Sequence, residues 1–295
     1  MTRSRRQVQY RRTITHKQRT VIVFLVDCSI SMLQQGRIGA LIMPKHQIVE
    51  LMCNLMIDEL VIRAKHHGRM CNYYDIAALG YSGDGVRSLL PGDSEGFIAV
   101  DRLAELMPQP KTTTLTHYTK GKEPVEFPMT CHEWIDPKPF GATSMVEGLV
   151  SVYMLTERWC RNLDNRDNFP PIVIHFTDGA YNEADKADII DLTSRIKNTY
   201  TLDGESLLFN IVLSDVDDDS IVLHTNRGFK TDSCERRLMF DTASLIPKSL
   251  ESLFEYMFEI NKQGPYRAAL FNASACELLS MLNIGTESIN SVRYL

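Results

Sequence analysis

The sequence has 295 residues, of which 44% are hydrophobic and 23% are charged, and its formal net charge is −5. This composition is ordinary for a soluble globular protein, and the length suffices for one large α/β domain with appendages. Charged residues interrupt every apolar run before it reaches the length of a membrane span. The composition therefore argues against a membrane-spanning protein.

Seven cysteines are scattered along the chain without a C-x-x-C pair, at positions 28, 53, 71, 131, 160, 234 and 276. An odd number without paired spacing indicates reduced thiols, not a disulfide framework or a structural zinc site. The first residues, Met-Thr-Arg-Ser-Arg-Arg-Gln, lack the apolar segment of a secretory signal. We therefore expect a cytoplasmic protein.

The charge is unevenly distributed. The first twenty residues contain seven Lys or Arg and no acid, which leaves 25 basic and 37 acidic residues in the remainder, a net charge of −12. We interpret residues 1–18 as a basic N-terminal arm, either a solvated tail or an ordered edge segment over 7–15. We do not expect nucleic acid as a partner, because no aromatic platform or recognition helix accompanies the arm.

The first predicted strand ends in an unusual polar sequence. Residues 20–26 are mostly β-branched or large apolar side chains, which is typical of a parallel strand buried on both faces. Asp27, Ser29 and Ser31 follow at intervals of two. Ligands of open α/β sheets bind at the carboxyl ends of strands, and these three hard oxygen donors are of the kind that Mg²⁺ prefers. We expect them at the protein surface.

The next elements alternate between helix and strand. A loop over 32–44 precedes a helix over 45–67, and two strands over 75–81 and 86–90 form a hairpin around a Ser-Gly-Asp-Gly turn. The glycines of this turn do not form a phosphate loop, because Val86-Arg87 stands where a P-loop has Lys-Ser/Thr.

Residues 108–140 contain six prolines and little helical periodicity, so we predict a long irregular insertion beside the site formed after the first strand. Cys131, His132, Glu133 and Asp136 lie in it, but their spacing is not that of metal ligands. Gly141-Ala142-Thr143 then precedes an amphipathic helix over 144–160.

A second buried strand over 171–176 ends in Thr177-Asp178-Gly179. Further predicted elements follow, namely a helix over 182–200, strands over 207–213 and 237–240, a helix over 246–260 and a helical tail over 263–295. The acidic residues at 215 and 217–219 lack the glycine and distal glutamate of an EF-hand, and solvated acids before a helix are an alternative to a calcium loop.

This alternation predicts an α/β fold with a doubly wound, mostly parallel central sheet, helices on both faces and one antiparallel edge strand. The D-x-S-x-S, G-x-T and T-D-G sequences occur in this order, each at a strand or helix boundary. In these motifs, over roughly residues 19–262, the chain resembles the von Willebrand factor A (vWA) family and its metal-ion-dependent adhesion site (MIDAS), a Rossmann-like fold.

The resemblance implies roles for five residues. Ser29, Ser31 and Thr143 would ligate Mg²⁺, or alternatively Mn²⁺, directly, while Asp27 and Asp178 would act through bound water. One position departs from the family, since Ile30 stands between the serines where glycine is common. In the family the cation binds an Asp or Glu of a partner protein, so the resemblance implies a cytosolic adaptor without catalytic residues.

Two further implications concern partners and chemistry. The chain is similar to compact bacterial-type vWA proteins, including those associated with tellurite resistance and with MoxR-type AAA+ ATPases, which implies such an ATPase or a kinase or phosphatase component as partner. The alternative is a metal-dependent phosphatase-like hydrolase using Asp27 and Asp178. Against it, Ser29 stands where a haloacid-dehalogenase-type enzyme needs its second Asp, and Gln34 where a cysteine phosphatase needs Arg.

Overall fold

The computed structural model describes residues 10–38, 41–91, 96–117, 125–214, 216–260 and 264–285. Its central sheet has the strand order β13-β14-β12-β11-β1-β6-β7, and β8 also pairs with β6. Five neighbouring strands are parallel: β6 (Tyr74–Ser82), β1 (Thr20–Asp27), β11 (Ile172–Thr177), β12 (Leu207–Val212) and β14 (Ala269–Phe271). Three strands pair antiparallel at the edges: β13 (Ile221–Val222), β7 (Gly85–Ser88) and β8 (Ile98–Ala99). The doubly wound α/β class is thus confirmed, with antiparallel strands at both edges.

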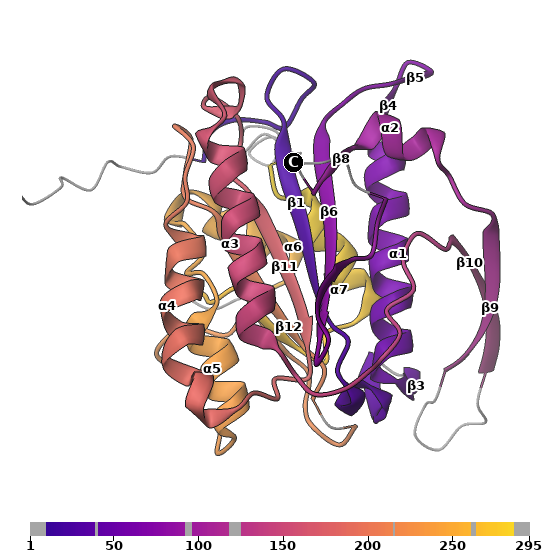
Figure 1. Ribbon diagram of the computed structural model, residues 1–295, viewed down its shortest axis with the longest axis vertical. Coiled ribbons are helices and arrows are strands. Elements are labelled where there is room, and N and C mark those ends of the chain that lie inside the picture. The colour runs from indigo at the N-terminus through magenta and orange to yellow at the C-terminus, as the bar shows by residue number, and fades with distance from the viewer. Residues whose placement is uncertain are drawn as a thin grey trace, which may run out of the picture.

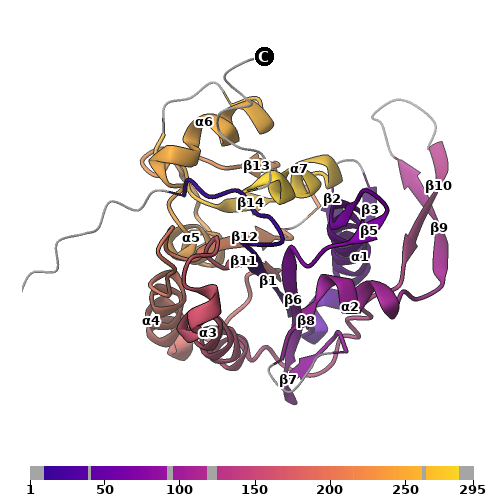
Figure 2. The same cartoon turned by 90° about the horizontal axis from the view of Figure 1, so that it is seen from above.

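Helices cover both faces of this sheet (Figures 1 and 2). One face carries α3 (Met145–Arg161), α4 (Lys186–Lys197) and α5 (Cys234–Thr242). The other carries α1 (Lys45–Arg63), α2 (Val100–Glu105) and α7 (Ala275–Ser280). A further helix, α6 (Lys248–Met257), stacks Phe254 on Phe209 of β12. All residues of β1, β11 and β12 are buried because both faces are covered.

Short elements complete the described chain. They are four 3₁₀ turns, η1 (Ile30–Leu33), η2 (Leu163–Asn165), η3 (Glu183–Asp185) and η4 (Met281–Asn283), and a two-stranded hairpin of β4 (Lys65–His66) and β5 (Arg69–Met70). Within the described ranges, no helix combines the length and the apolar character that crossing a membrane requires.

The predicted irregular insertion over 108–140 is instead largely a β-hairpin. Strands β9 (Pro110–His117) and β10 (Val125–His132) pair along their whole length and join β3 (Leu41–Pro44) and β2 (Gln35–Ile38) in a second sheet beside α1 (Figure 1). Pro128 is accommodated because β10 is an edge strand, where a missing N–H need not break a ladder. The prolines suggested an irregular loop, but the β-forming residues between them make most of this segment two strands.

The prediction for the C-terminal region was also partly wrong. Residues 237–240, predicted as a strand, lie in α5, whose N-terminus is capped by Ser233 accepting from the N–H of Arg236. A run of four residues is too short to distinguish the two periodicities. The predicted boundary at 262 separates β14 from the sheet to which it belongs, although the helix that follows it, α7, is present.

The N-terminal arm is packed against the domain from residue 10 onward. Tyr10 is buried beside Phe169, and its hydroxyl donates to the carbonyl of Glu205 at 2.7 Å. Ile14 is buried as well, and its N–H donates to the carbonyl of Gly285. Residues 10–18 are thus part of the folded domain, whereas residues 1–9 lie outside the described ranges.

Candidate metal centre

The carboxyl end of β1 brings three of the predicted site residues together. The N–H of Ser29 donates to Oδ1 of Asp27 at 2.8 Å, which turns the chain sharply after the strand. The Oγ atoms of Ser29 and Ser31 lie 2.9 Å apart and share a hydrogen bond. The two hydroxyls therefore converge where the chain enters η1.

Asp178 enters the same region from the neighbouring strand. Strands β1 and β11 are adjacent and parallel, so their carboxyl ends meet at one edge of the sheet. Thr177, the last residue of β11, donates its hydroxyl to Oδ2 of Asp27 at 3.2 Å. Asp178 accepts from the N–H of Ala180, and its side chain is 5% exposed. The motifs on the two strands therefore form one cluster.

Thr143 is placed through the backbone of the loop that precedes α3. The N–H of Phe140 donates to the carbonyl of Cys28 at 2.7 Å, and the N–H of Ile30 donates to the carbonyl of Gly141 at 2.9 Å. These bonds fasten the loop to the residues that follow β1. Thr143 itself is half-buried, and no hydrogen bond of its side chain to the other four residues is found in the described chain.

The turn between β6 and β7 supports this loop from the other side. Gly83 lies so close to Ala142 that a Cβ atom at position 83 would be 2.8 Å from the backbone nitrogen of Ala142. The Arg87 guanidinium also donates to the carbonyl of Lys138 at 2.8 Å. The glycine of the predicted turn is thus needed for a close approach of two backbones.

Two carboxylates lie close together at the centre of the cluster. Asp27 is fully buried, contrary to the expectation of a surface site, because Ser29, Tyr81 and Thr177 surround it. Burial, together with the negative charge of Asp178, raises the pKa of Asp27 from 3.8 to about 6. A cation bound near the two carboxylates would stabilise the charged form of Asp27 against both the burial and the repulsion by Asp178.

Three residues of this environment were not predicted. Tyr81, which pairs in register with Asp27, places its hydroxyl 3.2 Å from Oδ2 of Asp27 and 2.9 Å from Nε2 of His175. Burial lowers the pKa of His175 to about 4. Lys45 lies 3.8 Å from Asp178. The position of Tyr81 at the end of the adjacent strand is a signal that could have found it, whereas no sequence signal points to Lys45.

The donor set fits a hard divalent cation. It consists of three hydroxyls and two carboxylates, the oxygen ligands that suit Mg²⁺ or Mn²⁺. No group of three or more His, Cys, Asp or Glu side chains is gathered as a metal site within the described ranges, so a cation held here would depend on the hydroxyl oxygens. Both the convergence of the serine oxygens and the buried carboxylate pair are consistent with such a site.

The other acidic and histidine-containing segments have structural partners. His132 contacts Asp58 at 2.8 Å, and Asp58 also accepts from the indole of Trp134, which attaches the end of β10 to α1. Asp218 forms an ion pair with Arg236 at 2.8 Å. Residue 215 of the acidic segment lies outside the described residues. These contacts favour structural roles over a second cation site.

The elevated pKa of Asp27 predicts a pH-dependent stability in EDTA. Because the folded pKa is about 6 and the ordinary value 3.8, the folded state binds this proton more tightly than the unfolded state. The resulting stabilisation is complete below pH 4 and is lost as the pH rises through 6, by up to about 3 kcal/mol. Urea unfolding between pH 4 and 7 measures it. Asp27→Asn should lack this component, and identical pH slopes for both proteins would contradict the assignment.

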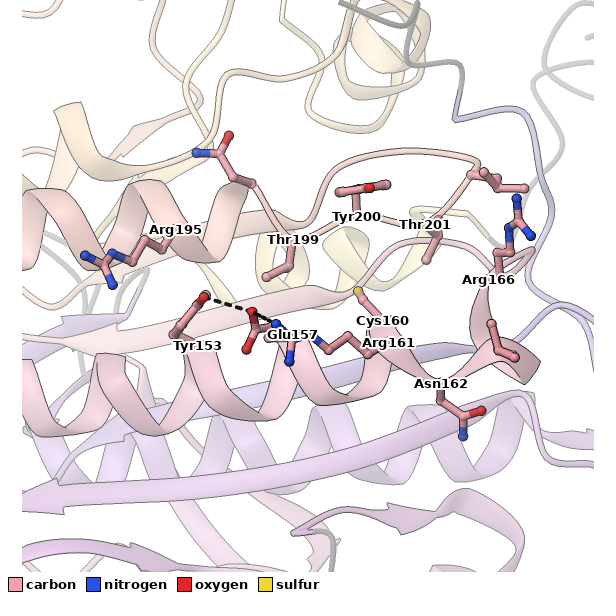
Figure 3. A pocket seen from close by; sticks show the side chains of 13 residues that line it. Tyr153, Glu157, Cys160, Arg161, Asn162, Arg166, Arg195, Thr199, Tyr200 and Thr201 are labelled. Atoms are coloured by element: carbon pink, nitrogen blue, oxygen red, sulfur yellow. Dashed lines mark hydrogen bonds and ion pairs between the residues drawn. The ribbon is translucent and has the colours of Figure 1, made fainter. Parts of the chain in front are cut away.

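A groove of about 610 Å³ lies between the C-terminal halves of α3 and α4 (Figure 3). Tyr153 donates to Glu157 at 3.0 Å and Arg161 pairs with the same carboxylate at 2.9 Å, as the dashed lines show. Burial raises the pKa of Cys160 to about 12, which makes its thiol a poor nucleophile. None of the five candidate site residues lines this groove.

Comparisons with known proteins gave matches of structure only. No protein-family model matches the sequence, and no curated protein matches it. A mutated aerotolerance-related membrane protein from Bacteroides fragilis matches with a TM-score of 0.37 and 11% identity, over 76% of this chain and 86% of that one. The SpRpn10 VWA domain matches with a TM-score of 0.41 and 10% identity, over 92% of this chain and 98% of that one. The PilB minor pilin from Streptococcus sanguinis matches with a TM-score of 0.40 and 10% identity, over 90% of this chain and 60% of that one.

Proposed function

We propose that this chain is a vWA-type protein-interaction module that binds an acidic side chain of a partner protein through Mg²⁺, or alternatively Mn²⁺, held at a MIDAS. The observation that carries the proposal is the meeting of Asp27, Ser29, Ser31 and Asp178 at the carboxyl ends of two adjacent parallel strands, with hydroxyl oxygens 2.9 Å apart. The loop containing Thr143 is fastened to the same turn. This convergence supports the ligand set that the vWA resemblance implies.

Ser29, Ser31 and Thr143 would hold the cation directly, and Asp27 and Asp178 would orient the water molecules around it. The cation supplies an electrophilic centre that accepts a carboxylate oxygen from outside. Asp27 is itself fixed by Ser29, Tyr81 and Thr177, so its position does not depend on the cation. A site pre-organised in this way loses little conformational entropy when it binds a ligand.

Exposed apolar side chains on the same loops support a protein partner. Ile30, Leu33 and Phe140 are 61%, 51% and 56% exposed, and they flank the turn after β1 and the loop before α3. Exposed apolar patches mark protein-interaction sites, and aromatic side chains such as that of Phe140 are enriched at protein interfaces. Ile30, the departure from the family pattern, thus provides contact area beside the serines. The partner we propose presents an Asp or Glu within an apolar surface.

The class of partner rests on the resemblance to bacterial-type vWA proteins. We propose a cytoplasmic assembly in which the partner is an AAA+ ATPase or a component of a kinase or phosphatase system. The chain would act there as an adaptor, because recognition through a metal-bound carboxylate requires no bond to be made or broken.

Titration calorimetry with Mg²⁺ and Mn²⁺ tests the metal site directly. We expect one cation per chain for the wild type, and a loss of affinity of about tenfold or more for Ser31→Ala and Thr143→Ala, because each removes one direct ligand. Ser194→Ala and Thr112→Ala, at exposed positions on α4 and β9, are matched controls and should bind like the wild type. Binding that is unchanged in Ser31→Ala and Thr143→Ala would refute this ligand assignment.

A further inference from the structure

Lys45 is a buried cation inside the candidate metal centre. Its Nζ lies 3.8 Å from Oδ2 of Asp178, and the two side chains are only 4% and 5% exposed. A distance of 3.8 Å is too long for a hydrogen bond, so the interaction is between the charges. Since water is largely excluded, the attraction is screened less than that of a surface pair.

The local structure does not account for a lysine at this position. Lys45 is the first residue of α1, where the helix dipole disfavours a positive charge. Burying an ammonium group adds a further cost unless a partner compensates it. Asp178 is that partner, and it comes from a distant part of the chain.

The chain holds the lysine in place from both sides. The N–H of Lys45 donates to the carbonyl of Gln34 at 2.9 Å, which connects it to the turn that carries the two serines. Gly36 makes room for its aliphatic stem, because a Cβ atom at position 36 would lie 2.7 Å from Cγ of Lys45. The ammonium group is therefore directed to Asp178 by the same segment that forms the site.

We propose that Lys45 is an internal counter-cation that competes with the divalent metal for Asp178 and so lowers the affinity of the site. This inference rests on the proposed function. Asp27 and Asp178 together supply two negative charges, which would neutralise one divalent cation. Lys45 already compensates one of them, so a metal entering the site meets a positive charge within the same cluster. The site would then fill only at higher metal concentrations than its oxygen ligands alone would require.

The test compares Mg²⁺ and Mn²⁺ affinities of the wild type and Lys45→Met by titration calorimetry. Methionine preserves the apolar stem and removes the charge. We expect Lys45→Met to bind about tenfold more tightly or better, and Lys45→Arg to bind like the wild type because the charge is retained. Lys65→Met removes an exposed lysine just beyond the other end of α1 and should leave the affinity unchanged.

The outcomes separate this inference from the metal site itself. Equal or weaker binding by Lys45→Met, with binding lost in Ser31→Ala, would overturn the role of Lys45 and leave the metal site standing. If neither the wild type nor Lys45→Met binds the metal, both the proposed metal site and the proposed role of Lys45 are refuted. Should Lys45→Met fail to fold in EDTA, Lys45→Gln is measured instead. The increase in melting temperature on adding millimolar Mg²⁺ should then be larger for that variant than for the wild type.

Discussion

Asp27→Asn is expected to abolish Mg²⁺-dependent binding of the partner protein while the chain stays folded. The carboxylate is fully buried and accepts from Ser29, Tyr81 and Thr177, so it orients the site and supplies half of its negative charge. Asparagine has nearly the same shape and keeps an acceptor for the N–H of Ser29. Alanine would instead leave three donors without their acceptor and cost about 1–3 kcal/mol for each one left unsatisfied, which makes it the poorer variant.

An affinity pull-down from a lysate of the native cells, in parallel with Mg²⁺ and with EDTA, measures this effect. A protein retained by the wild type only with Mg²⁺, and not by Asp27→Asn, would identify the partner. Asp191→Asn is a matched control, because it removes an exposed carboxylate on α4 that pairs with Arg195 in the same helix. If the same proteins appear in every lane, or none does, the metal-bridged mode of binding is refuted, and phosphatase activity of the purified protein becomes the next measurement.

Truncation after residue 262 is expected to eliminate cooperative unfolding. The removed segment contains β14, which pairs with β12 on one side and β13 on the other. Leu270 and Phe271 are fully buried, and the ring of Phe271 stacks on Phe229 at 5.3 Å. Loss of these two side chains alone removes about 3–6 kcal/mol of burial energy, which is comparable to the whole stability of many domains.

Thermal unfolding followed by circular dichroism measures the result. A chain that ends at residue 285 is the appropriate control, because it retains β14, α7 and the hydrogen bond from Ile14 to the carbonyl of Gly285. It should show one cooperative transition. A truncation at 262 that melts like this control would mean that β14 contributes nothing to the sheet and would contradict the observed pairing.

Local patterns were sufficient for the elements that are buried on both faces or strongly amphipathic. The apolar run over 20–26 became β1, and the turn between residues 82 and 85 joins β6 to β7 as predicted. The same holds for the approximate helix over 144–160. In each case the residues that determine the structure are near neighbours in the sequence, so periodicity reports them.

Segments whose structure depends on distant partners were predicted less well. The residues of β9 and β10 contain prolines and threonines with no clear alternation, and they become strands because they pair with each other and because β9 also pairs with β3. Residues 237–240 fit a strand or a helix equally until Ser233 caps α5. The basic arm contributes Tyr10 to the core through contacts with residues 203 and 205, which no local pattern reveals.

The candidate site, too, was predictable from the sequence only in part. Sequence alone indicated its candidate oxygen donors, because Asp27, Ser29 and Ser31 lie within five residues after one strand and the T-D-G and G-x-T sequences lie at the boundaries of other elements. Only the tertiary structure decided that Asp27 is buried, that Tyr81 contacts it, and that the ammonium of Lys45 lies beside Asp178. Spacing along the chain specifies which groups a turn can present together. Burial and charge pairing depend on which distant segments the folded sheet and helices bring into contact, and those contacts set the charge of the site.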